Sequence, residues 1–121
     1  MINFASMDKV REIKLFRNYF TEFYVSLPEK VRRKIGYSLW MVETQRIVPK
    51  KFFSFIEGSD GIYEIRTEYE GNIYRVFCCM DKGNLVVLFH GFQKKTQKTP
   101  RNQIERAEKL KEEYFKNKEE Q

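Results

Sequence analysis

Positively charged side chains are concentrated in one short stretch of the chain, HGFQKKTQKTPR at residues 90–101. The stretch holds no acidic residue, and hydroxyl and amide side chains lie between its cations. The cations are Lys94, Lys95, Lys98 and Arg101. Lysine and arginine bind phosphate through charge and hydrogen bonds, so this stretch could contact a nucleic-acid backbone. Such runs are also common as solvated connections between elements, and the residues alone leave both interpretations open.

One arginine stands where the middle of a sheet is expected. Residues 73–80 read as a strand that is apolar on both faces, which is typical of a central strand, and Arg75 shares a face with Phe77. An arginine in that place needs a partner or a ligand. Either its fork of N–H donors grips a phosphate, or Arg75 forms a structural salt bridge with Glu64 or Glu68 across a hairpin.

Proton transfer needs a group that titrates near neutral pH, and the sequence offers few. Arginine stays charged at any working pH, so it suits charge stabilisation and not general-base catalysis. His90 is the first candidate because the unperturbed pKa of histidine is about 6.5, and Tyr74 and Glu64 are weaker ones. His90 also alternates with Leu88 and Phe92. A half-buried histidine with a packing role is therefore the alternative.

The composition is that of one folded, basic domain spanning residues 1–121. Its 41% hydrophobic content excludes a disordered chain. The net charge of +6 and the pI of about 9.3 favour a polyanionic partner such as nucleic acid. No window reaches the roughly 18 apolar residues of a membrane span, and the N-terminus lacks the apolar core of a secretory signal. We therefore expect a cytoplasmic protein without membrane contact.

Metal and redox chemistry are not expected from the residues present. The two cysteines, Cys78 and Cys79, are adjacent, a spacing that fits neither a loop-closing disulfide nor a metal pair. They are expected in the core, on opposite faces of a strand. Because the chain has a single histidine, a zinc site is improbable, and we expect no metal and no cofactor.

The first half of the chain predicts one strand and two helices. Residues 11–17 read as a short edge strand. Apolar residues then recur at helical spacing to about Leu27, and again after Pro28 to residues 44–46. A connection of only two or three residues predicts an antiparallel helix pair.

The second half predicts strands and a final helix. From residue 52 the period changes to that of β-strands, with turn residues at 70–72 and 81–84. Thr99 and Pro100 suit the start of a last helix. The ends, residues 1–10 and 116–121, are expected to be loosely ordered and frayed. The fold class is α+β: a helix pair, an antiparallel sheet of about four to five strands, and a C-terminal helix.

The sequence resembles the RelE/ParE superfamily of toxins from bacterial type II toxin–antitoxin pairs, and most of all its phage-derived HigB-type branch. The likeness covers about residues 11–115. Its most specific part is HGFQKKTQKTP after a strand, and YEIR and NIYRVF occur in the matching order. The resemblance implies a small α+β fold in which helices pack on one face of a twisted antiparallel sheet.

The resemblance also implies a function. Such toxins are ribosome-dependent endoribonucleases that cut messenger RNA without a metal ion, and a cognate antitoxin silences them. The antitoxin is often a helix-turn-helix DNA-binding protein, so operator DNA would be reached only through it. In the reaction the 2′-hydroxyl of the substrate attacks the adjacent phosphate, and the enzyme moves protons and stabilises charge.

Site residues follow from the resemblance position by position. Arg75 matches the strand arginine placed on the scissile phosphate, and Arg66 matches the arginine one strand earlier. The basic cluster after the last strand, assigned to RNA binding, comprises Lys94, Lys95, Lys98 and Arg101. The better-known members carry lysines four and two positions before the arginine at 66, where this chain has Ile62 and Glu64. A general base is therefore not assigned by the resemblance, and His90 is the provisional acid or base.

Two other functions remain open at this point. A ParE-like protein of the same fold would poison DNA gyrase by binding it, without chemistry of its own. A degenerate RNA-binding domain would keep the basic surface and lack cleavage. A gyrase binder has no need of a phosphate-gripping arginine on a central strand, whereas Glu64 and Ile62 support the degenerate domain.

Overall fold

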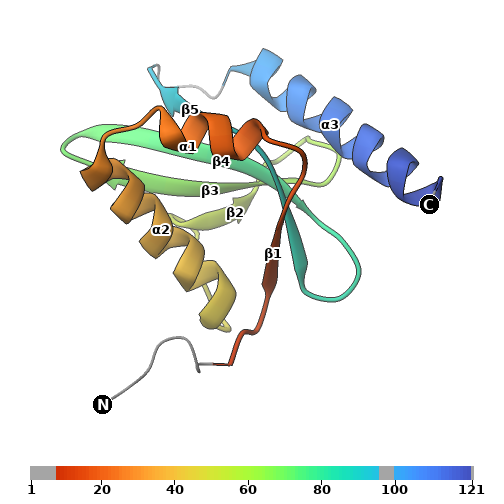
Figure 1. The fold of residues 1–121 in the computed structure, drawn as a ribbon, viewed down its shortest axis with the longest axis horizontal. Helices are drawn as coiled ribbons and strands as arrows, with labels where there is room; N and C mark the ends of the chain where they lie inside the picture. The colour runs from red at the N-terminus through yellow and green to blue at the C-terminus, as the bar shows by residue number, and fades with distance from the viewer. Residues whose placement is uncertain (1–7, 96–99, 121) are drawn as a thin grey trace.

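The computed structural model describes residues 8–95 and 100–120, which form three helices and a five-stranded sheet (Figure 1). The strands are β1 (Glu12–Leu15), β2 (Phe53–Phe55), β3 (Ile62–Tyr69), β4 (Asn72–Met80) and β5 (Leu85–Lys94). The helices are α1 (Tyr19–Val25), α2 (Glu29–Thr44) and α3 (Arg101–Glu119). The α+β class and the order of elements agree with the prediction. Lys98, assigned to RNA binding, and Thr99, expected at the start of the last helix, lie outside the described residues.

The sheet is mixed, with strand order β1-β5-β4-β3-β2. The strands β2 to β5 pair antiparallel, as predicted. The edge strand β1 instead runs parallel to β5, with Glu12 opposite Leu85 and Leu15 opposite Leu88. The prediction of a wholly antiparallel sheet is therefore wrong at β1. Two helices and three strands separate β1 from β5 in the chain, and a local hydrophobic pattern does not carry the direction of so distant a pairing.

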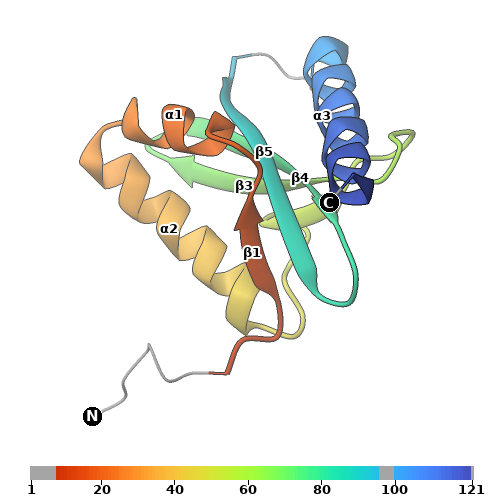
Figure 2. The ribbon, with the colours of Figure 1, turned by 45° about the vertical axis from the view of Figure 1, so that its right-hand side comes forward.

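Helices cover both faces of this sheet, so the expectation that helices pack on one face alone is wrong. The helices α1 and α2 lie on one face and α3 on the other, as the views in Figures 1 and 2 show. The two N-terminal helices share a face as predicted, but they diverge from their connection in a V instead of running side by side (Figure 2). Each packs mainly on the sheet: α1 over β5, and α2 over β3. The result is a layer of helices, the sheet, and one further helix.

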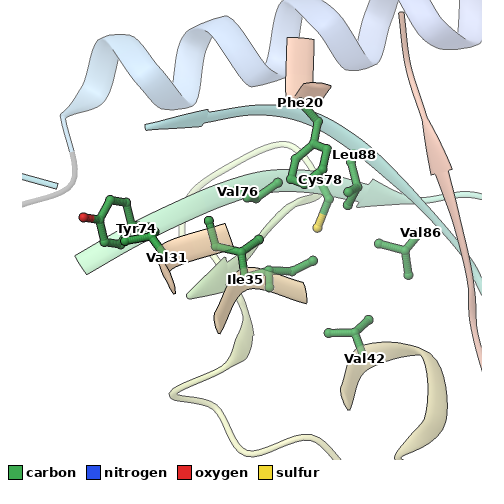
Figure 3. Packing of buried hydrophobic residues seen from close by; sticks show 10 residues of the cluster. Phe20, Val31, Ile35, Val42, Tyr74, Val76, Cys78, Val86 and Leu88 are labelled. Carbon is green, nitrogen blue, oxygen red and sulfur yellow. The ribbon is translucent and has the colours of Figure 1, made fainter. Parts of the chain in front are cut away.

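Each face of the sheet has its own core. The core under α1 and α2 centres on Phe20, Ile35, Val42, Val76 and Leu88, which point toward one another in Figure 3. The core under α3 joins Ile62, Phe77, Val87 and Phe89 to Ala107, Leu110 and Tyr114 of the helix. Cys78 belongs to the first core and Cys79 to the second, which confirms their placement on opposite faces. Burial raises the pKa of Cys78, and it raises that of Cys79 to about 12, so both thiols stay protonated.

The end of α2 is held by a side chain from the segment before β1. The Arg11 guanidinium donates hydrogen bonds to the carbonyl oxygens of Val42, Gln45 and Arg46, at 3.0, 2.8 and 3.0 Å. The last carbonyls of a helix have no partner within the helix, and a cation beside them also complements the helix dipole. Arg11 thereby fixes the C-terminus of α2 next to the edge of the sheet.

Gly91 allows α1 to approach β5 closely. A Cβ atom at this position would overlap the ring of Phe23 on α1. We expect Gly91→Ala to lower the free energy of unfolding by about 1–3 kcal/mol, because a packed interface must shift to admit the methyl group. Urea denaturation followed by circular dichroism measures this change.

Gly36 provides the matched control. It lies within α2, and an added Cβ meets nothing within 4 Å. Gly36→Ala should raise the free energy of unfolding by about 0.5–1 kcal/mol, because alanine is the better helix former. Equal stability of Gly91→Ala and the wild type would contradict the close approach of α1 and β5.

Candidate active site

Three cations meet on the α3 face of the sheet, toward the turn that joins β3 and β4. Arg66 on β3 lies directly opposite Arg75 on β4. Lys94 ends β5, opposite Ile73 and therefore diagonal to Arg75. The apolar contacts of α3 lie farther from this turn, around Ile62, Cys79, Val87 and Phe89. The cations therefore occupy the part of the face beyond the core under α3.

The turn itself sets the pairing of the two arginines. Glu70 and Gly71 both have positive φ, 48° and 80°, and Tyr69 pairs with Asn72. This is the two-residue hairpin geometry whose twist matches that of the strands. Counting back from it places Arg66 against Arg75, so turn chemistry determines which side chains share the site.

Arg75 is ion-paired with Glu64. Its Nη1 atom donates to Glu64 Oε2 at 2.7 Å, and the two side chains are only 10% and 14% exposed. The structural salt bridge considered as an alternative is therefore present. The partner carboxylate lies on the neighbouring strand β3, diagonal to Arg75. A buried pair of this kind is costly to break, because either charge alone would be left without compensation.

Arg66 is held more loosely. Its Nη2 atom contacts Glu68 Oε1 at 2.7 Å, with side chains 27% and 62% exposed. Its Nε atom is buried and has no hydrogen-bond partner among the described residues. A buried N–H donor without a partner is uncommon in folded proteins. Arg66 can therefore offer a further donor to an incoming anion.

Lys94 experiences the same cluster of charges. Burial, followed by the positive charges of Arg75 and Arg66, lowers its pKa, while Glu64 acts in the opposite direction. Lys95 is exposed. Arg101 is exposed as well and pairs with Glu105 on its own helix at 3.4 Å. Of the predicted RNA-binding residues, only Lys94 is thus joined electrostatically to the two arginines among the residues described.

An irregularity in β5 brings His90 to the same face. Val76 pairs with Gly91, whereas Cys78 pairs with Leu88, so Phe77 faces two residues of β5. This bulge turns both Phe89 and His90 toward α3. Leu88 points to the opposite core. The expected alternation of Leu88 with His90 is therefore wrong, because one extra residue breaks the period of two.

His90 is enclosed between the sheet and the start of α3. It is 2% exposed, and its Nε2 atom lies 2.8 Å from Gln103 Oε1. The rings of Phe77 and Phe92 pack beside it. Its pKa is lowered to about 4, mainly by burial and also by the charge of Arg106, and the Gln103 hydrogen bond partly opposes this. His90 is neutral at pH 7, and this environment favours packing over proton transfer.

The sequence places this chain within a known family. Residues 22–112 match the family described as Phage derived protein Gp49-like (DUF891). The chain belongs to this family. The match includes β2 to β5, and with them Arg66, Arg75, His90, Lys94 and Lys95. No curated protein matches the chain.

Further features of the Gp49-like chain concern metals and membranes. Among residues 8–95 and 100–120, no three histidine, cysteine or acidic side chains gather as metal ligands would. None of the helices described is long and apolar enough to span a bilayer.

Tyr74, named as a weaker proton-transfer candidate, lies in the core under α1 and α2, on the face away from Arg75.

Two residues of the site were missed or only half recognised in the sequence. Gln103 was not considered, although it precedes Ala107 by one helical turn and is thus a polar residue on the buried stripe of α3. Glu68 was considered as a partner of Arg75, but it pairs with Arg66 on its own strand. A polar residue within an apolar stripe was the available signal for Gln103.

The two ion pairs of this Gp49-like site should differ in strength. We expect Glu64→Gln to lower the free energy of unfolding by about 3 kcal/mol or more, because Arg75 would remain buried without its counter-charge. Glu68→Gln is the matched control and should cost less than about 1 kcal/mol, since its pair is exposed. Urea denaturation of both variants tests this, and equal losses would contradict the difference in burial.

His90 should make the stability depend on pH. Its pKa is about 6.5 in the unfolded chain and about 4 in the fold. Between these values the unfolded state binds more protons, so stability falls as the pH drops from about 7 to about 4, by on the order of 3 kcal/mol. Urea denaturation of the wild type and of His90→Gln across this range measures the contribution. We expect a shallower decline in the variant, and parallel curves would refute it.

Proposed function

We propose that this Gp49-like protein is the toxin of a toxin–antitoxin pair and an endoribonuclease that cleaves messenger RNA on the ribosome. The observation that carries the proposal is the cluster of Arg66, Arg75 and Lys94 beside Glu64 on one face of the sheet. The membership of a phage-derived family and the resemblance to RelE/ParE toxins support it. The basic character of the chain fits an RNA substrate.

The cations would bind and stabilise the scissile phosphate. Attack by the 2′-oxygen puts additional negative charge on the phosphate oxygens, and fixed positive groups stabilise that charge. Arg66 has a free Nε donor among the described residues and an exposed counter-ion, so phosphate can displace Glu68 from it. Arg75 is fixed by Glu64 and would contribute its positive charge from a preorganised position.

Glu64 is the proposed general base, and Lys94 the proposed acid. The Glu64 carboxylate would take the proton of the 2′-hydroxyl while the 2′-oxygen bonds to phosphorus. The bond from phosphorus to the 5′-oxygen then breaks, and Lys94 would give that oxygen a proton. The products are a 2′,3′-cyclic phosphate and a 5′-hydroxyl. A lowered pKa makes Lys94 a better proton donor than an ordinary lysine, and these roles use no metal ion.

His90 has a different place in this proposal. It was the first candidate for proton transfer, but Gln103 and two phenylalanine rings enclose it. We assign it a positioning role, in which it ties the start of α3 to β5 behind the cations. The exposed Lys95 and Arg101 remain proposed contacts to the RNA backbone.

The proposed partners are messenger RNA in the ribosome and a cognate antitoxin. An antitoxin of the helix-turn-helix class would connect the pair to operator DNA, which this chain would contact only indirectly. A second candidate function is RNA binding without cleavage. The ion pairing of both arginines favours it, because each carboxylate competes with phosphate for its arginine.

Expression of wild type and Arg66→Gln in a bacterial host tests the proposal, with cut sites mapped on translated and untranslated copies of one message. We expect the wild type to arrest growth, and to cut only the translated copy. Arg66→Gln should reduce cutting about 100-fold or more, the usual effect of losing one charge-stabilising donor. Arg75→Ala is a poorer probe, because a buried ion pair would be broken and the fold weakened.

Glu68→Gln is the matched control for Arg66→Gln. It lies on the same strand face and removes only the counter-ion of Arg66, so cutting should persist at the wild-type rate or faster. Arrest by the wild type with intact messages would refute the nuclease and indicate a gyrase-type target. Absence of arrest together with RNA binding would favour the non-cleaving domain.

A further inference from the structure

A second basic surface lies on the opposite side of the molecule from the candidate active site. Lys30, Arg33 and Lys34 on α2 form a shallow groove with Tyr37 and with Tyr69 at the end of β3. The face of the sheet that carries α2 is the one away from Arg66 and Arg75. The described residues of this groove thus combine three cations with two aromatic rings.

Two of the three cations of this groove lack a counter-ion among the described residues. Lys30 and Lys34 are exposed, and neither has an ion pair among the described residues. They lie one helical turn apart, a spacing at which like charges repel. Acidic groups at the rim are Glu29, which pairs with Arg33 at 2.7 Å, and Glu70, beside Tyr69. Two repelling lysines without counter-ions do not stabilise the helix, so binding of an anionic ligand is the better explanation for them.

The aromatic rings are presented for contact. Tyr37 is 54% exposed, and its ring stacks on Trp40 at 5.7 Å between centroids with an interplanar angle of 28°. Trp40 thereby supports Tyr37 from within the same helix. A rigid, exposed ring beside cations is the combination on which nucleic-acid bases stack while the phosphates bind the cations.

The groove and the candidate site meet at one end of the sheet. Tyr69 is three residues from Arg66 on β3, a distance of about 10 Å along the strand. The two side chains point to opposite faces, and the short turn at Glu70 and Gly71 closes the strand pair just beyond them. A strand of RNA that crosses this end of the hairpin can therefore reach both surfaces.

We infer that the groove binds single-stranded RNA, with a base stacked on Tyr37 and backbone phosphates on Lys30 and Lys34. This inference rests on the proposed function. The groove would bind the part of the messenger RNA that lies to one side of the cleavage point. The mixture of cation and aromatic ring favours RNA over an apolar protein segment. The binding is sequence-tolerant, because every base offers a face for stacking.

Binding of a short, labelled 2′-O-methyl RNA tests this inference, because such RNA lacks the attacking hydroxyl and cannot be cleaved. Fluorescence anisotropy over a series of salt concentrations gives the affinity and its salt dependence. For Lys30→Gln/Lys34→Gln we expect a slope of log K against log salt that is shallower by about 1.4, from two lost phosphate contacts. Lys109→Gln/Lys116→Gln, two exposed lysines of α3, is the matched control and should keep the wild-type slope.

Variants of the tyrosine separate stacking from simple apolar contact. Tyr37→Leu should weaken RNA binding about five-fold or more, while Tyr37→Phe keeps the ring and should bind as the wild type does. The inference would be overturned if the Lys30→Gln/Lys34→Gln and Lys109→Gln/Lys116→Gln variants showed the same salt dependence of RNA binding. Binding of RNA by Tyr37→Leu at the wild-type affinity would also overturn it. Unchanged RNA binding with loss of binding to the antitoxin would also overturn it and assign the groove to a protein.

This experiment is separate from the test of cleavage. If the wild type cuts no message but the α2 variants lose affinity as expected, the RNA surface stands without the nuclease. If messages are cut and the α2 variants bind RNA unchanged, the groove inference fails alone.

Discussion

The ion pair between Arg75 and Glu64 is the constraint around which this fold is arranged. A guanidinium on a central strand cannot be covered by an apolar helix without a counter-charge, and the carboxylate that supplies it comes from the neighbouring strand at 2.7 Å. The pair fixes where the apolar core on this face must end. Beyond it, Arg66 and Lys94 can remain close to solvent, while Ile62 and Phe77 on the other side are packed under α3. One buried interaction therefore divides a single face into a structural part and a charged part.

The bulge in β5 adapts the strand to this division. With a strict period of two, either Phe89 or His90 would point toward α3, but not both. The extra residue opposite Phe77 lets Phe89 complete the core while His90 reaches Gln103 near the start of the helix. Beyond the bulge, Phe92 and Lys94 continue on the same face toward the arginines, and Gly91 faces α1 on the other side. The bulge thus affects the packing of α1 and α3 on β5 as well as the position of Lys94.

Many of the helices and strands can be predicted from the sequence, because the patterns that indicate them are local. Alternation of polar and apolar residues marks the strands. The sequence places the first connection at residues 70–72, whereas the structure has a two-residue turn at Glu70 and Gly71, and this difference of one residue sets Arg66 against Arg75. What the sequence does not convey depends on distant parts of the chain. The parallel pairing of β1 with β5, the bulge at Phe89 and His90, and the enclosure of His90 by Gln103 all follow from packing between separated elements. The low pKa of His90 belongs to the same class, since it arises mainly from burial.

Glu64 changes how the proposed site would bind RNA, compared with a lysine at the same position. A lysine there would stand beside Arg66 and Arg75, and three repelling cations would be difficult to pack on half-buried strands. With glutamate the fold is satisfied, but three cations against the carboxylates of Glu64 and Glu68 leave a net charge of only about one. A cluster of such low net charge attracts a polyanion only weakly at long range, so in the proposed function its contribution would come from short-range geometry. Under the proposed function, affinity for RNA would come from elsewhere on the surface. Lys30 and Lys34 of α2, which have no ion pair among the described residues, line a groove with Tyr69 at the same end of the hairpin. In the proposed function, a preorganised site of low net charge and a separate basic groove would thus share the binding of RNA.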